Sequence, residues 1–258
     1  MKRTHEVLID TEACIGCGLC KGDCPMNNIV VEERVAHVVS QRCIMCGHCV
    51  AICPKGAVSM TGFDEEPVEL HGRMSVDADT LALALKARRS VRQFTARPVD
   101  ADVLDRIVEA GRVTPTGGNA QEVEFVVLRD ALPEVEHVAL RLFRRLFPFA
   151  KRFDASVARV EIDEHFFFKG APVALAVVAK DTVDASLAAA NMALMAEVCG
   201  LGVLYSGFFA TATRFSPSLR RMLGLRRGQR VVATLVLGHP AVRYRRTAPK
   251  EPASVRML

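Results

Sequence analysis

The sequence predicts an α+β protein with two domains, a small N-terminal one and a larger C-terminal one. Eight of the nine cysteines lie between Cys14 and Cys53, and this region repeats with an offset of 29 residues (43 minus 14). From residue 79 onward, helix-like patterns alternate with short apolar runs, which is typical of a sheet with covered faces. We therefore place the first domain at 1–60, a linker at 61–78 and the second domain at 79–258.

The overall composition limits the classes of function that this protein can have. The net charge is +5, and the basic excess lies beyond residue 60, because residues 1–60 hold six basic and six acidic side chains. Aromatic residues make up only 6% and no nucleic-acid-binding motif occurs, so a phosphate-bearing cofactor explains the arginines better than nucleic acid does. No run approaches the roughly 20 apolar residues of a membrane span. Since no signal-peptide pattern follows the basic start, we expect a cytoplasmic protein without a membrane partner.

The N-terminal repeat predicts two similar halves. In each half, a strand-like segment precedes the cysteine run and another follows it. These segments lie at 7–9 and 29–31 in the first half, and at 36–39 and around Val58 in the second. This order predicts two pseudo-symmetric βαβ-like halves.

The cysteines follow one spacing twice. Residues 14–25 and 43–54 both read C-x2-C-x2-C-x3-C-P. This is the run that ligates [4Fe–4S] clusters in bacterial two-cluster ferredoxins, where the fourth cysteine of each run serves the other cluster. We therefore predict one cluster on Cys14, Cys17, Cys20 and Cys53, and the other on Cys43, Cys46, Cys49 and Cys24.

Two other uses of these cysteines match the pattern less well. A structural zinc site normally takes two C-x2-C pairs, not two repeated quartets. Disulfides are typical of exported proteins, and a C-x2-C-x2-C run supplies few cysteine pairs that can face each other. The resemblance to bacterial two-cluster ferredoxins covers residues 8–60. Cys199 stands alone, and we expect it to be a buried small residue without a redox role.

The second domain is expected to alternate helices and strands. Helix patterns occupy 79–89 (capped by Asp79), 100–112, 135–153, 184 to about 200, and 217–223. Strand patterns occupy 123–129, 172–180, 203–205 and 231–237.

A group of basic residues ends the first of these helices. Arg88, Arg89, Ser90 and Arg92 lie within five residues, and guanidinium groups with a hydroxyl suit a phosphate. Taken alone, the same residues would serve equally well as a solvated helix C-terminus, where the helix dipole favours cations. Neither a Rossmann fingerprint nor a P-loop is present.

Together with later motifs, this element resembles the nitroreductase family of FMN proteins. Those motifs are T-P-T-G-G-N-A-Q at 114–121, L-Y-S-G-F at 204–208, L-G-H-P at 237–240 and R-Y-R-R at 243–246. The resemblance spans residues 79–250. It implies an α+β sandwich, with a central, mostly antiparallel sheet flanked by helices, and a homodimer with FMN at its interface.

The resemblance also implies which residues bind FMN. Arg88, Arg89, Ser90 and Arg92 match the residues that hold the phosphate, the ribityl chain and the pyrimidine edge. Pro115, Thr116, Gly117, Asn119 and Gln121 match the segment that reaches the flavin from the partner subunit. Leu204, Tyr205, Ser206 and Gly207 form the turn expected at the flavin ring, and Arg245 or Arg246 is expected to close on the phosphate. The chain departs from the family at Glu122-Val123, where Pro-Trp often stands, and at Ser206, where some members are acidic.

This combination predicts an FMN- and iron–sulfur-dependent oxidoreductase. We expect the clusters to relay single electrons to FMN, which then reduces a small acceptor such as a nitro compound, a quinone or an activated alkene. The flavin carries the chemistry, so no side chain is predicted to be catalytic. Two alternatives stay open at this stage: NAD(P)H could feed the flavin and electrons leave through the clusters, or the chain could be a non-catalytic electron-transfer module. An external ferredoxin or NAD(P)H is the expected donor.

Overall fold

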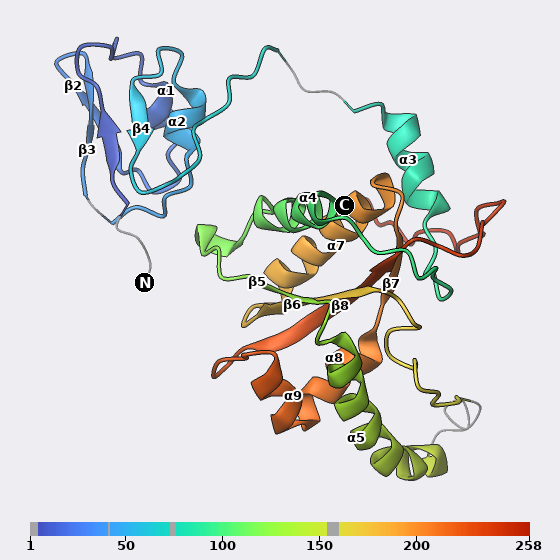
Figure 1. Ribbon diagram of the computed structural model, residues 1–258. Helices are drawn as coiled ribbons and strands as arrows, with labels where there is room; N and C mark the ends of the chain where they lie inside the picture. Colours follow the sequence, from blue (N-terminus) through green and yellow to red (C-terminus); the bar gives the residue numbers. More distant parts are fainter. Residues whose placement is uncertain (1–4, 41, 73–75, 154–159) are drawn as a thin grey trace. The chain divides into compact units, whose positions relative to one another are not determined.

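The computed structural model describes residues 5–40, 42–72, 76–153 and 160–258, with no side chains described for 147–153 (Figure 1). The chain divides into two compact units. The first contains Met1–Ser75 and Gly117–Ala120, and the second contains Val76–Thr116 and Gln121–Leu258.

The first unit consists of two antiparallel strand pairs and two short helices. Its elements are β1 (Val7–Ile9), α1 (Leu19–Gly22), β2 (Ile29–Glu32), β3 (Val35–Val38), α2 (His48–Ile52) and β4 (Val58–Met60), with the 3-10 turn η1 (Gly117–Asn119). β1 pairs with β4, and β2 pairs with β3. Each pair therefore takes one strand from each half of the repeat. Gly18 and Gly47 precede the two helices at equivalent positions, and both have a positive φ.

The second unit is built on a four-stranded antiparallel sheet. Its strands are β5 (Glu124–Leu128), β6 (Val173–Ala179), β7 (Gly202–Tyr205) and β8 (Arg230–Gly238), in the order β5-β6-β8-β7. Every neighbouring pair is antiparallel. The predicted mostly antiparallel sheet is therefore confirmed.

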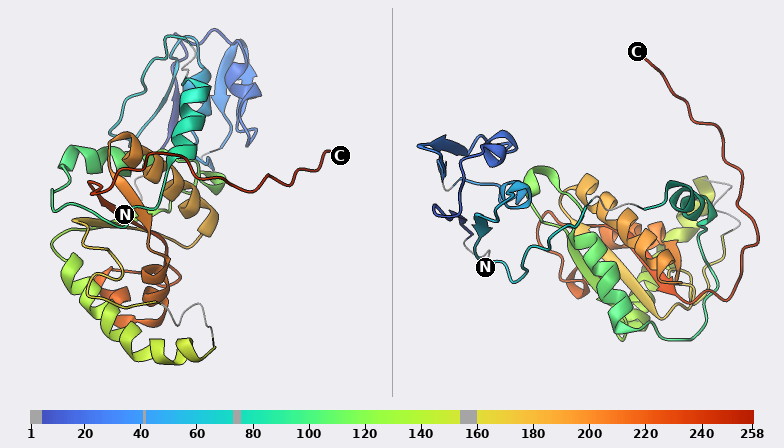
Figure 2. Two further views of the ribbon diagram at one scale, coloured as in Figure 1. Left: turned by 90° about the vertical axis from the view of Figure 1, so that its right-hand side faces the viewer. Right: turned by 90° about the horizontal axis from the view of Figure 1, so that it is seen from above.

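Helices cover both faces of this sheet (Figures 1 and 2). The second unit contains α3 (Ala78–Ala87), α4 (Ala101–Arg112), α5 (Leu132–Phe153), α7 (Thr182–Val198), α8 (Gly207–Phe215) and α9 (Pro217–Met222). α4 and α7 pack on one face, while α5, α8 and α9 pack on the other. β6 is buried on both sides, because Leu175 and Val177 point into the first layer while Ala174 and Ala176 point into the second. In the described part of the chain, no helix combines the length and the apolar character that crossing a bilayer requires.

Several helix starts differ from the sequence-based expectation, and α5 begins at Leu132 instead of residue 135. Asp77, and not Asp79, caps α3, because its carboxylate accepts the N–H of Thr80 at 2.7 Å. Asp181 caps α7 in the same way, three residues before the expected Asp184. α8 was not predicted at all, since aromatic and β-branched residues within it lower its intrinsic helix propensity.

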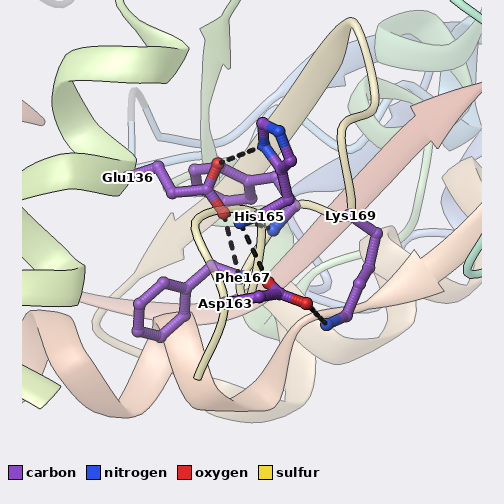
Figure 3. Close-up of polar contacts among 6 residues, drawn as sticks. Glu136, Asp163, His165, Phe167 and Lys169 are labelled. Atoms are coloured by element: carbon purple, nitrogen blue, oxygen red, sulfur yellow. Dashed lines mark hydrogen bonds and ion pairs between the residues drawn. The ribbon is translucent and has the colours of Figure 1, made fainter. Parts of the chain in front are cut away.

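A buried carboxylate joins α5 to the chain that enters β6 (Figure 3). Glu136 Oε1 accepts the backbone N–H groups of Phe167 and Phe168 at 3.0 and 2.9 Å. Its other oxygen lies 3.8 Å from His165 Nδ1. Burial raises the pKa of Glu136, although the two N–H groups oppose this effect. The carboxylate therefore serves as an internal cap for the turn before β6.

Candidate functional site

The eight N-terminal cysteines line two cavities in the first unit. Cys14, Cys17, Cys20 and Cys53 line one cavity, and Cys24, Cys43, Cys46 and Cys49 line the other. Each cavity thus receives three cysteines from one run and the fourth from the other run. Among the described residues, no three His, Cys, Asp or Glu side chains gather closely enough to hold a single metal ion. Four cysteines around one cavity, three from one run and the fourth from the other, match the crossed ligation of a [4Fe–4S] cluster.

Backbone N–H groups point at four of these sulfurs. The donors are Ala36 to Cys14 (3.4 Å), Asn28 to Cys24 (3.3 Å), Met45 to Cys43 (3.4 Å) and Ala57 to Cys53 (3.3 Å). Such donors stabilise anionic sulfur, the form that binds iron. Burial raises the pKa of the Cys20 and Cys49 thiols, since a thiolate loses its hydration there. A bound iron centre would reverse that preference, because it holds the sulfur as thiolate.

In the second unit, the arginine motif lies beside β7. Ser90 forms a parallel bridge with Val203, and the Val91 N–H donates to the Val203 carbonyl at 3.0 Å. Gly202, on β7, allows this approach, because a Cβ there would come within 2.7 Å of the Val91 side chain. Its partner across the sheet, Gly238, is equally restricted by Pro172 and Phe94. The motif and the 204–207 turn are therefore brought together.

Two buried guanidinium nitrogens in this motif lack a hydrogen-bond acceptor. They are Arg88 Nε and Arg89 Nη2, both unpartnered within the described residues. The Nη1 of Arg89 does have partners, since it donates to the carbonyls of Lys86 and Arg88 at the end of α3. A buried donor without an acceptor is destabilising, and phosphate oxygens would satisfy these two. The residues present thus fit the phosphate of a nucleotide cofactor.

Arg88 also faces two titratable groups. Burial raises the pKa of Tyr205 and of Glu197, and the Arg88 guanidinium opposes the shift in both cases. The Tyr205 hydroxyl donates to the Ala189 carbonyl at 2.9 Å, so its proton is already engaged. Glu197, in the last turn of α7, was not predicted as a site residue, because it belongs to no recognisable motif.

Ser206 and Gly207 form the start of α8. The buried Ser206 donates its backbone N–H to the Thr234 carbonyl at 2.8 Å, while its side chain makes no cap hydrogen bond. The Ser206 side chain therefore leaves the first N–H groups of α8 uncapped, and these groups need another acceptor.

Two further groups of predicted residues lie in the C-terminal segment and around the 3-10 turn η1. Arg245 and Arg246 are exposed in the C-terminal segment, which Tyr244 links to the arginine motif by donating to the Ser90 carbonyl at 3.4 Å. Tyr244 was not predicted as a site residue. In the segment from Pro115 to Gln121, the Thr116 hydroxyl accepts the Gln121 N–H at 3.0 Å. Gly117 and Asn119 belong to the first unit, where Asn119 contacts a cysteine loop.

Two families match this chain. Residues 85–239 match the nitroreductase family, and residues 6–54 match the 4Fe-4S dicluster domain. A relative from Bacillus subtilis, named FMN reductase [NAD(P)H], is 29% identical over 62% of this chain and 66% of its own length. A protein from Archaeoglobus fulgidus, provisionally named NADH dehydrogenase/NAD(P)H nitroreductase, is 26% identical over 59% of this chain and 81% of its own length.

Solved structures agree on the fold. A nitroreductase with bound FMN from Desulfitobacterium hafniense superposes with a TM-score of 0.57 at 22% identity, covering 70% of this chain and 100% of its own. A nitroreductase with bound FMN from Bacteroides fragilis superposes with a TM-score of 0.55 at 23% identity, covering 69% of this chain and 98% of its own. The chain therefore belongs to the nitroreductase family and carries a two-cluster [4Fe–4S] ferredoxin domain at its N-terminus.

Proposed function

We propose that this oxidoreductase takes single electrons through its two [4Fe–4S] clusters and uses FMN to reduce a small acceptor. One observation carries the proposal: a single chain combines two crossed cysteine quartets with buried arginine nitrogens that need an anionic partner. When bound, FMN supplies the step that gathers single electrons and delivers them in pairs. Nitro compounds, quinones and activated alkenes are the acceptor classes that suit this chemistry.

The chain's own residues bind and orient these cofactors. The two cysteine quartets would hold the clusters, with Cys53 and Cys24 crossing between the runs. Arg88, Arg89, Ser90 and Arg92 would hold the phosphate, the ribityl chain and the pyrimidine edge of FMN. Leu204, Tyr205, Ser206 and Gly207 would lie along the ring, and Arg245 or Arg246 would close on the phosphate. Pro115, Thr116, Gly117 and Gln121 would reach the flavin of the second subunit of a homodimer.

We place the protein in the cytoplasm. All nine cysteines are free thiols in the structure, and the proposed cluster ligation requires that eight of them stay reduced. Thiols persist in a reducing compartment, whereas an oxidising one would favour disulfides.

The test is an anaerobic comparison of electron sources. Protein with iron, sulfide and FMN quantified per chain is mixed with reduced ferredoxin or with NADPH, and flavin absorbance is followed. We expect reduced ferredoxin to bleach the flavin and to sustain turnover of a nitroaromatic or quinone acceptor. Protein that carries both cofactors but turns over no acceptor from either source would contradict the proposal.

One observation favours a second direction of electron flow. Relatives of the flavin domain are named for NAD(P)H. If this donor preference extends to the present chain, NAD(P)H would reduce FMN and the clusters would pass electrons outward. Rapid bleaching by NADPH, followed by reduction of an added ferredoxin, would support this direction.

A further inference from the structure

Asn119 makes a contact that its place in the 114–121 motif, expected to reach the flavin, does not explain. Its carboxamide Nδ2 donates to the carbonyl oxygens of Ile44 and Met45, at 2.9 and 2.8 Å. These two residues form the loop between Cys43 and Cys46, and Met45 lines the second cavity together with both cysteines. Asn119 and this loop belong to the same compact unit, although 75 positions separate Asn119 from Ile44 along the chain.

The contact continues directly to a sulfur. The Ile44 carbonyl and the Met45 N–H belong to one peptide group, and that N–H donates to Cys43 Sγ at 3.4 Å. Asn119, the peptide and the sulfur thus form a chain of two hydrogen bonds. A donor on the carbonyl polarises the peptide and strengthens the bond made by its N–H. Hydrogen bonds to the sulfurs are one of the factors that set the potential of an iron–sulfur cluster.

The two halves of the repeat support this loop differently. In the first half, Gly16 takes the place of Met45, and a Cβ on Gly16 would lie 2.2 Å from the Arg34 carbonyl oxygen. The turn between β2 and β3 therefore packs closely on the first loop. In the second half, the chain leaves β4 at Met60 and continues toward the second unit. The second loop instead receives Asn119, from a distant part of the sequence.

We propose that Asn119 is a positioning residue for the second cluster, and that it raises the reduction potential of that cluster through the Ile44–Met45 peptide. This inference rests on the proposed ligation of a cluster by Cys43. The amide hydrogens place positive partial charge near the cluster loop, which favours the more negative, reduced cluster. Asn also suits the backbone here, because Asn119 has a φ of 53°.

The experiment replaces the carboxamide in two ways. Asn119→Asp keeps the shape but places carboxylate oxygens against the two carbonyls, whereas Asn119→Gly keeps the positive φ and removes the side chain. In anaerobic titrations of the full chain, followed by absorbance and EPR, we expect one cluster wave to move to more negative potential. The shift should be larger for Asp, and the other cluster wave should stay in place. Asn191→Asp is the matched control, since its Nδ2 donates to Thr114 Oγ1 at 2.8 Å in the second unit.

Iron and FMN contents separate the outcomes. Unchanged potentials with full iron content would overturn the role of Asn119. Loss of FMN with both cluster waves unchanged would assign the side chain to the flavin instead. A shift of both waves would indicate a general loss of structure and would also contradict the proposal. Wild-type protein without iron would contradict the proposed function itself.

Discussion

At the scale of single residues, the most informative feature is a pair of buried nitrogens. Arg88 Nε and Arg89 Nη2 are removed from water without an acceptor in the described chain. Each such donor costs about 1–3 kcal/mol. Backbone contacts at Ser90 and Val91 hold the motif in place, and an arriving anion would recover this energy. This is a physical reason to expect binding, independent of the family.

We therefore predict that Arg88→Met weakens FMN binding. The loss of a charge-assisted hydrogen bond, about 1.5–3 kcal/mol, corresponds to a Kd raised about 10- to 150-fold. Equilibrium titration with FMN, followed by fluorescence quenching, measures the change. Arg112→Gln is the matched control, because Arg112 forms a surface ion pair with Glu109 in the last turn of α4. An unchanged Kd for Arg88→Met would remove Arg88 from the site.

Glu136 allows a prediction about stability. Its folded-state pKa lies above its ordinary value of 4.5, because burial and the nearby Asp163 oppose ionisation more strongly than the two N–H groups and His165 favour it. The protonated carboxyl therefore adds to the free energy of unfolding below pH 4.5, and this contribution is lost as the pH rises through the folded-state pKa. Relative to wild type, Glu136→Gln should gain stability over that range, because its carbonyl still accepts both N–H groups.

Glu136→Leu should instead destabilise the protein at every pH. It leaves two buried N–H groups without an acceptor, at about 1–3 kcal/mol each. Urea unfolding at a series of pH values, followed by flavin release, measures both variants. A Glu136→Gln variant whose stability parallels that of wild type across this pH range would show that the carboxyl does not titrate between the two states.

At the scale of elements, the sequence predicted most strands and helices of the second unit. Continuous apolar runs mark β6 and β8, because both faces of these strands are buried. The helix caps were predicted less well, since Asp77 and Asp79 compete near one helix start and only the Thr80 contact decides between them. Glu136 could not be predicted, because the sequence does not distinguish it from the nearby Glu134. The Asn119 contact joins distant positions, and no local pattern reports it.

Packing between elements gives a third prediction. Gly202→Ala would place a Cβ within 2.9 Å of three Val91 side-chain atoms, so β7 and the arginine motif must separate. We expect lower FMN content and partial recovery in the double variant with Val91→Ala, which removes two of the three crowded atoms. Gly22→Ala is the control, since a Cβ there meets nothing within 4 Å. Full FMN retention in Gly202→Ala would show that this approach is not needed.

At the scale of the whole molecule, the proposed flavin site needs two chains. The arginine motif would come from one subunit and the segment around Gln121 from its partner. Consider a dimer of one chain altered in the arginine motif and one chain altered near Gln121. Both substitutions would fall on the same flavin site and leave the other site intact, because a two-fold interface uses the same surfaces twice.

Co-expression of Arg88→Met with Gln121→Leu tests this arrangement. Random pairing should restore roughly one quarter of the wild-type FMN content, since half of the dimers are mixed and each has one intact site. Each variant expressed alone should bind little FMN, which is the necessary control. If co-expression restores no FMN, both segments must serve a flavin within one chain.

The placement of Gly117–Ala120 in the first unit has a consequence for how this protein can be taken apart. The chain passes into the second unit at Val76, returns to the first unit for Gly117–Ala120, and continues in the second unit from Gln121. Cleavage near residue 75 would therefore release a ferredoxin fragment without Asn119. Such a fragment would be a poor reference for the redox behaviour of the intact protein, and grafting this module onto another flavoprotein would require transplanting both pieces.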